Sequence, residues 1–95
     1  MSTENYYSLL HILTEVLRIT DNSMRIHHTT DDDARYHTVE IMYVGNNFVN
    51  LTINDVNVNI SFADIKLMDY DVEEDGLLNG FLHYVIDNHY YKTKK

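Results

Sequence analysis

Apolar side chains at the start of the chain recur every three or four residues, which is the period of one face of an α-helix. Ser2 or Thr3 is a suitable N-cap, and Glu4 then lies in the first turn, where a carboxylate interacts favourably with the helix dipole. A turn-forming segment, 20–23, ends the pattern. We therefore expect a helix over about residues 4–20, whose buried face carries Tyr6, Leu9, Leu10, Leu13, Val16 and Leu17.

The middle of the chain changes to a period of two, which is typical of strands with one buried face. Apolar and polar residues alternate over about 38–44, 48–53 and 56–61, and a shorter alternation over 24–28 suggests an extra strand. A two-residue turn at 54–55 makes every inward pair of the second hairpin apolar. The predicted pairs are Ile53 with Val56, Leu51 with Val58, and Val49 with Ile60.

The first hairpin admits two registers. A two-residue turn at 46–47 would place Glu40 opposite Ile53 and bury a carboxylate. A three-residue loop at 45–47 places apolar residues opposite one another, and a slip of one residue would turn that apolar set outward. We expect the three-residue loop, with Val39 opposite Ile53, Ile41 opposite Leu51, Tyr43 inward, and Met42 and Val44 outward.

A second helix is predicted over about residues 71–90. Asp71 followed by Glu74 resembles a capping box. Gly80 lies within this helix, where glycine costs about 1 kcal/mol relative to alanine, and we interpret it as a close contact with the sheet. The apolar stripe of the helix consists of Leu77, Leu78, Phe81, Leu82, Val85 and Ile86.

These elements predict a single small α+β domain over residues 1–95, because a chain of this length has one core. The expected order is α-β-β-β-α, with a three- or four-stranded antiparallel meander covered on one face by helices. Residues 92–95 are expected to form a frayed basic tail.

The chain is strongly acidic, with a formal net charge of −8 from fifteen acidic and seven basic residues. Three of the basic residues lie in segment 92–95, which leaves four over residues 1–91. Such a surface repels nucleic acid and anionic lipid and attracts basic protein surfaces. The start of the chain also lacks the basic and apolar segments of a signal peptide. We expect a cytoplasmic protein that binds neither nucleic acid nor membrane directly.

The composition predicts no catalytic residues, cofactor or metal. The absence of cysteine excludes thiolate chemistry and Cys-based zinc sites, and three glycines are too few for a phosphate-binding loop. Segment 71–76 resembles the start of an EF-hand loop, but position 12 is Leu82 instead of glutamate. His27, His28 and His37, with the carboxylates of 31–33, leave a metal- or ligand-binding module as one alternative.

Two groups of residues predict a protein-binding surface. The first is an acidic run over 64–75, which includes Tyr70, with a second acidic patch at 31–33. The second is an outward apolar cluster at the first hairpin. Apolar anchors beside a polar rim are typical of protein interfaces. The predicted partner-binding residues are Asp31, Asp32, Asp33, Met42, Val44, Phe48, Asp69, Tyr70, Asp71, Glu73, Glu74 and Asp75.

The layout and charge resemble the small inhibitors that phages encode against host defences, and the α-β-β-β-α order is similar to that of some type II anti-CRISPR proteins. The resemblance covers the whole chain and consists of pattern and charge, without a signature motif. It implies a carboxylate-rich surface that replaces DNA phosphates in the basic cleft of a host nucleic-acid-binding protein, such as a CRISPR nuclease.

We therefore expect a non-enzymatic acidic inhibitor in the host cytoplasm. A small assembly or adaptor subunit that forms homodimers through its polar sheet face or an edge strand is the second alternative.

Overall fold

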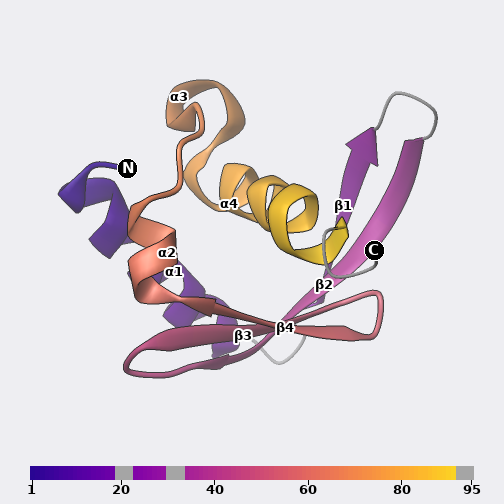
Figure 1. Ribbon diagram of the computed structural model, residues 1–95, viewed down its shortest axis with the longest axis horizontal. Helices are drawn as coiled ribbons and strands as arrows, with labels where there is room; N and C mark the ends of the chain where they lie inside the picture. The colour runs from indigo at the N-terminus through magenta and orange to yellow at the C-terminus, as the bar shows by residue number, and fades with distance from the viewer. Residues whose placement is uncertain (19–22, 30–33, 92–95) are drawn as a thin grey trace.

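A four-stranded antiparallel sheet, in the order β1-β2-β3-β4, carries the helices of this chain on one of its faces (Figure 1). The structure is a computed structural model that describes residues 1–18, 23–29 and 34–91. No helix in those three ranges is long and apolar enough to cross a membrane. Its elements are α1 (Thr3–Leu17), β1 (Ser23–Thr29), β2 (Ala34–Val44), β3 (Phe48–Ile53), β4 (Val56–Ser61), α2 (Phe62–Lys66), α3 (Val72–Asp75), α4 (Leu77–Val85) and a π-helical turn, η1 (Ile86–Tyr90).

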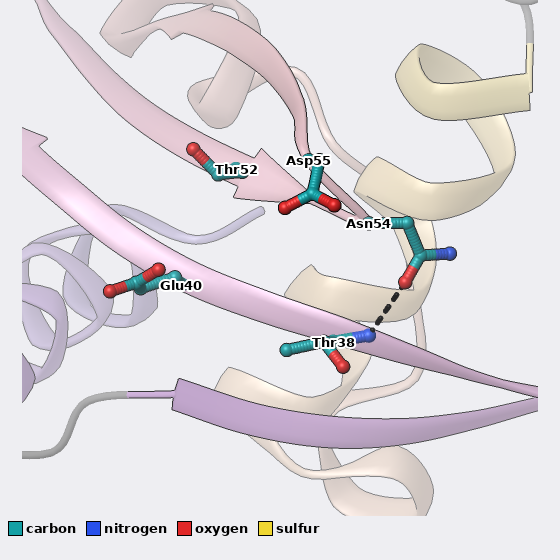
Figure 2. A pocket seen from close by; sticks show the side chains of 5 residues that line it. All are labelled: Thr38, Glu40, Thr52, Asn54 and Asp55. Carbon is teal, nitrogen blue, oxygen red and sulfur yellow. Dashed lines mark hydrogen bonds between the residues drawn. The ribbon is translucent and has the colours of Figure 1, made fainter.

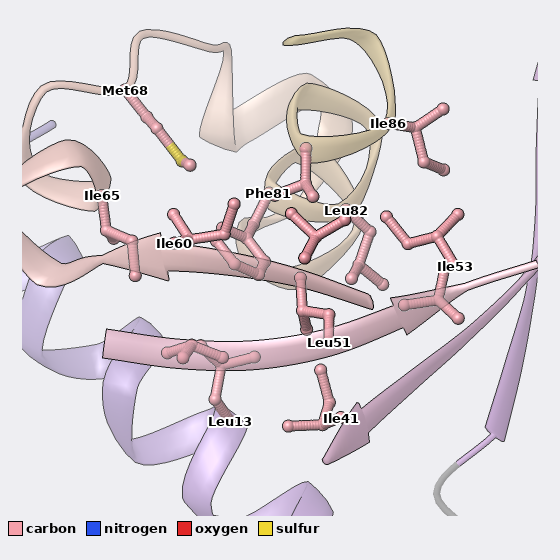
Figure 3. Close-up of a cluster of buried hydrophobic side chains, with 14 of the residues drawn as sticks. Leu13, Ile41, Leu51, Ile53, Ile60, Ile65, Met68, Phe81, Leu82 and Ile86 are labelled. Atoms are coloured by element: carbon pink, nitrogen blue, oxygen red, sulfur yellow. The ribbon is translucent and has the colours of Figure 1, made fainter. Parts of the chain in front are cut away.

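The predicted α+β class is confirmed, and the extra strand suggested by the alternation over 24–28 is β1. Alternate residues of the strands are buried, whereas Thr38 and Glu40 between them are exposed, so only one face of the sheet borders the core. Figure 3 shows the buried side chains gathered between the strands and the helices. Burying each large apolar side chain contributes about 1.5–3 kcal/mol. The fully buried residues include Leu9, Leu13, Ile41, Leu51, Ile53, Ile60, Ile65, Phe81, Leu82 and Ile86.

The second hairpin has the predicted turn and register. Asn54 and Asp55 form the turn with φ of 47° and 70°, values that asparagine and aspartate tolerate better than most residues. The turn is joined to β2, because Asn54 N–H donates to Thr38 O and Thr38 N–H donates to Asn54 Oδ1, both at 3.0 Å. All three predicted pairs form: Ile53 with Val56, Leu51 with Val58, and Val49 with Ile60.

The first hairpin contains a β-bulge that the sequence pattern did not predict. Both predicted apolar pairs form, but the register then shifts between Ile41 and Tyr43, which leaves Met42 as the extra residue. Beyond the bulge the two faces are exchanged. Tyr43, predicted to face inward, is exposed, and Val44, predicted to face outward, is half-buried against the core.

The loop of this hairpin is also shorter than predicted. Gly45 N–H donates to Phe48 O at 2.9 Å, so the turn consists of residues 46–47 alone. In a hairpin without a bulge, a two-residue turn at 46–47 would place Glu40 on the buried face. The bulge removes the conflict because it restores the apolar register, and Glu40 lies opposite Thr52 on the exposed face.

The helix ends follow local capping. Ser2 caps α1, since its Oγ accepts from Asn5 N–H at 3.1 Å, and α1 ends at Leu17, before the predicted position 20. Helix α2 was not predicted. It begins because the Oγ of Ser61, at the end of β4, accepts from Asp64 N–H at 3.1 Å.

The predicted helix over 71–90 is divided into three pieces. Asp71 is the N-cap as predicted, and its Oδ1 accepts from Glu74 N–H at 3.0 Å. Gly76 then adopts a φ of 84°, which ends α3 and starts α4 in a new direction. The prediction of one continuous helix was therefore wrong. Residues 92–95, predicted to be frayed, lie outside the described residues.

Candidate functional site

Five carboxylates lie together around α3, on a segment that we call the acidic corner. The segment is held by short main-chain bonds, in which Asp75 N–H donates to Asp71 O at 2.8 Å and Gly76 N–H donates to Val72 O at 2.9 Å. In Figure 1 it stands apart from the sheet, at the top of the view. The structure thus places together the predicted acidic residues of this run, all exposed: Asp69, Asp71, Glu73, Glu74 and Asp75.

These carboxylates form no ion pair within the described part of the chain, although the ammonium group of Met1 lies nearby and donates to Met68 O at 3.0 Å. No Lys, Arg or His side chain there lies within 4.0 Å of a carboxylate of the acidic corner. Lys66, the nearest cation in sequence, lies over the ring of Tyr6, with 4.9 Å between its Nζ and the ring centroid. The acidic corner therefore presents like charges to solvent and is electrostatically complementary to a basic surface.

Tyr70 has a structural role within this segment. Its hydroxyl donates to Leu77 O at 2.9 Å, and its ring packs against Gly80. The close contact predicted for Gly80 is therefore with Tyr70 and not with the sheet. Burial raises the pKa of the Tyr70 phenol from 10.0 to about 12. Tyr70 is half-buried and ties the acidic corner to α4, which leaves little of it for a partner.

Two other acidic sites stand apart. Asp64 belongs to the same acidic run but lies in the first turn of α2, where it is exposed. The second predicted patch, Asp31 to Asp33, lies outside the described residues.

An exposed apolar cluster, which we call the aromatic tip, forms at the end of the β2–β3 hairpin. It consists of Met42, Tyr43 and Phe48, with exposed fractions of 50%, 55% and 37%. The rings of Tyr43 and Phe48 are 5.7 Å apart between centroids. Val44 was predicted to belong to this surface and Tyr43 was not, because the bulge at Met42 exchanges the two faces.

The acidic corner and the aromatic tip are not one continuous patch. In Figure 1, α2 lies between α3 and the β2–β3 turn. The main-chain bond from Phe62 N–H to Asn47 O, at 2.8 Å, ties the start of α2 to the tip. A partner that contacts both surfaces must therefore extend around α2.

A shallow hollow of about 270 Å³ lies on the open sheet face beside the β3–β4 turn (Figure 2). Its side chains are polar or acidic, and all but the half-buried Thr52 are exposed. No acid or base in the hollow has the dry environment that usually tunes a catalytic group. The hollow is lined by Thr38, Glu40, Thr52, Asn54 and Asp55.

His27 and His37 do not converge, and the side chain of His28 and the carboxylates of 31–33 lie outside the described residues. His27 is exposed beside Tyr36, whereas His37 is buried on the other face of the sheet, with its Nε2 3.0 Å from Tyr91 Oη. Residues 23–29 and 34–91 contain no group of three or more His, Asp or Glu side chains able to hold a metal ion. Leu82, at the twelfth position of the EF-hand-like segment, is buried in the core.

Comparisons of the chain with protein-family models, with curated proteins and with solved structures gave no match.

Proposed function

We propose that this chain is a non-enzymatic protein-binding domain that uses its acidic corner to occupy a basic, nucleic-acid-binding surface of another protein. The observation that carries this proposal is the set of five exposed carboxylates within residues 69–75, none of them paired with a cation of the described chain. Surfaces that bind nucleic acid carry clustered Lys and Arg side chains for phosphate. Clustered carboxylates offer those side chains charge-assisted hydrogen bonds in place of the phosphates.

The local structure supports this role because it holds the carboxylates in place. The cap at Asp71 and the bond from Tyr70 to Leu77 restrain the segment at both ends. A preorganised binding segment loses less conformational entropy when it meets its partner. Its like charges also accelerate association with a basic partner, by an amount that falls as salt is added.

The aromatic tip supplies a second, apolar contact in this proposal. Aromatic and methionine side chains are enriched in interfaces. The apolar surface that they bury contributes binding free energy that added salt does not screen. A CRISPR nuclease is one partner of suitable chemistry, on the basis of the resemblance in layout alone. Such a partner would place the chain in the cytoplasm of the host cell.

The experiment is affinity capture with matched baits. Immobilised wild-type chain and the variant D69N/E73Q/E74Q/D75N are exposed to the same nuclease-treated bacterial lysate, and the bound proteins are identified by mass spectrometry. The variant keeps Asp71, so the cap of α3 is intact. We expect wild-type bait to retain a nucleic-acid-binding protein that short duplex DNA or RNA displaces and that the variant does not retain. Equal capture by the two baits, or capture that nucleic acid does not reverse, would contradict the proposal.

A further inference from the structure

Strand β4 is an edge of the sheet, and one side of its backbone is open. In an antiparallel hairpin closed by a two-residue turn, residue pairs that exchange two main-chain hydrogen bonds alternate along the strands with pairs that exchange none. Val56, Val58 and Ile60 are in the bonded pairs, so the N–H and C=O groups of Asn57 and Asn59 point away from β3. Within residues 1–18, 23–29 and 34–91, no group bonds to these main-chain atoms.

This edge lacks the features that usually protect an edge strand. Natural edges are blocked by lysine, proline, bulges or a covering segment. The sequence of β4, Val-Asn-Val-Asn-Ile-Ser, has no charge and no proline, and its pairing with β3 is regular throughout. The opposite edge strand, β1, differs because it carries a charged side chain, Arg25, which lies over the ring of Tyr36 at 4.4 Å from the centroid.

The side chains of β4 are already ordered on the open face. Asn50 Nδ2 donates to Asn57 Oδ1 at 2.8 Å and to Asn59 Oδ1 at 2.6 Å, and Asn57 Nδ2 donates back to Asn50 Oδ1 at 2.9 Å. These bonds hold the side chains across β3 and β4 and away from the free edge. A strand that binds this edge would therefore pair with an ordered backbone and would not need to displace the asparagine side chains.

Charge selects the kind of strand that fits. Exposed carboxylates lie at both ends of β4, Asp55 just before the strand and Asp64 just after it. Opposite Ser61, on the same face of the sheet, is the partly exposed ring of Phe48, with Tyr43 beside it. Ser61 is small, so a long cationic side chain on an added strand can pass over it and reach the aromatic faces.

A second copy of the chain fits this edge less well. Two β4 strands could pair antiparallel through their free main-chain N–H and C=O groups. Asp55 of each copy would then lie near Asp64 of the other copy. Like charges would then meet at both ends of the interface, in chains that each carry a net charge of −8.

We propose that the free edge of β4 binds an extended, basic segment of a partner protein, which adds to the four-stranded sheet as a fifth strand. In Figure 1, β4 and α3 lie on opposite sides of the fold, so this edge is a different surface from the acidic corner. It borders the aromatic tip but does not depend on the function proposed for the acidic corner.

The probe is a capped heptapeptide in which valine and threonine alternate between lysine and arginine ends. Amide hydrogen exchange and chemical shifts are followed by NMR on the full chain. We expect the peptide to slow exchange of the Asn57 and Asn59 amides by about tenfold or more, because it would bond to these otherwise solvent-facing groups. A peptide of the same sequence with glutamate ends should bind at least about tenfold more weakly.

Matched variants test the backbone contact. Asn59→Pro removes the outward N–H and keeps the ladder to β3, whereas Asn59→Ala removes the same side chain and keeps the N–H. We expect Asn59→Ala to bind the peptide and Asn59→Pro to lose binding at least about tenfold. If Asn59→Pro does not fold, a peptide N-methylated at its β4-facing amides serves the same purpose on the wild-type chain, and it should not bind. The variant D55N/D64N should lose most of the preference for basic ends.

Three results would overturn the proposal. One is peptide binding that survives Asn59→Pro in a folded chain, or binding to the wild-type chain that survives N-methylation of the peptide. Another is the absence of any binding by the basic peptide at millimolar concentration. The third is protection of the Asn57 and Asn59 amides that rises with protein concentration alone, together with dimers in sedimentation, since it would assign the edge to a second copy. The neutralised acidic-corner variant should bind the peptide like the wild-type chain, which separates this surface from the one in the proposed function.

Discussion

The ring of Tyr70 occupies the space that a side chain on Gly80 would need. A Cβ at Gly80 would lie 2.6 Å from Cε2 and 3.3 Å from Cγ of that ring. The ring cannot easily move away, because its hydroxyl is bonded to Leu77 O in the turn that precedes Gly80. This contact joins the segment carrying the acidic corner to α4.

Gly80→Ala should therefore destabilise the domain, although alanine is the better helix former. The gain in helix propensity is about 1 kcal/mol, whereas forcing a methyl group into a closely packed contact costs about 1–3 kcal/mol or more. Urea unfolding measures the difference. In a Tyr70→Ala background the clash is absent, so the same substitution should become neutral or stabilising. A Gly80→Ala chain that is more stable than wild type would contradict the packing described.

Tyr70 should also contribute to alkaline unfolding. Its pKa is raised to about 12 in the folded chain by burial, against 10.0 for an exposed phenol. Its contribution is fully present below pH 10 and is lost as the pH rises toward 12, because the unfolded chain releases the proton first. Tyr70→Phe should lose about 1 kcal/mol at neutral pH with the bond to Leu77, and its stability should fall less steeply than that of wild type over this range. Parallel curves for the two chains would show that Tyr70 titrates like an exposed phenol.

The register of the second hairpin predicts a large contrast between two adjacent residues of β3. Leu51 is fully buried, so Leu51→Ala should cost about 2–5 kcal/mol. Asn50 lies on the open face, and Asn50→Ala removes its exposed bonds to Asn57 and Asn59 at a cost of about 1 kcal/mol or less. Equal losses in urea unfolding would contradict the register.

The bulge at Met42 predicts the reverse of the sequence pattern for the next two residues. Val44→Thr places a hydroxyl against the core and should cost about 1–2 kcal/mol. Tyr43→Thr replaces an exposed ring and should cost less than about 1 kcal/mol, mainly through the lost contact with Phe48. Threonine suits a strand at both positions, so strand propensity does not confuse the comparison. A larger loss for Tyr43→Thr would indicate that the strand continues without a bulge.

These two hairpins show how far the sequence determines the fold. Asn54 and Asp55 tolerate positive φ and have matched apolar alternation on both sides, so local chemistry and long-range pairing predict the same register. At the first hairpin they disagree, because the turn prefers one register and the apolar pairs prefer the other. An extra residue reconciles them, and no single residue type marks its position.

The acidic corner was largely predictable because its carboxylates are adjacent in sequence and share one short turn. Gly76 is a residue type that often ends a helix. The capping pattern at Asp71 before it and the apolar stripe that begins at Leu77 after it nevertheless predicted one continuous helix. The predicted meander already places 56–61 at an edge of the sheet, because the last strand of a meander has a single neighbour. Whether another segment of the chain would cover that edge could not be predicted from the strand pattern, since it depends on how the helices pack.

Neutralising the acidic corner should leave the domain folded, with little change in its stability. Asp69, Glu73, Glu74 and Asp75 are exposed, unpaired with the described cations, and close to one another, so D69N/E73Q/E74Q/D75N removes repulsion. Carboxylates in the first turn of α3 also interact favourably with its dipole, and we expect the two effects to leave stability within about 0.5 kcal/mol of wild type at low salt. Added salt should stabilise the wild-type chain more than the variant, because only the wild type has this repulsion to screen. Asp71→Ala should behave differently and still cost about 1 kcal/mol at high salt, where repulsion is screened, since it removes the cap on Glu74 N–H. Urea unfolding at low and high salt separates the two cases, and a large loss in the neutralised variant would show that these carboxylates maintain the fold and are not held there for a partner.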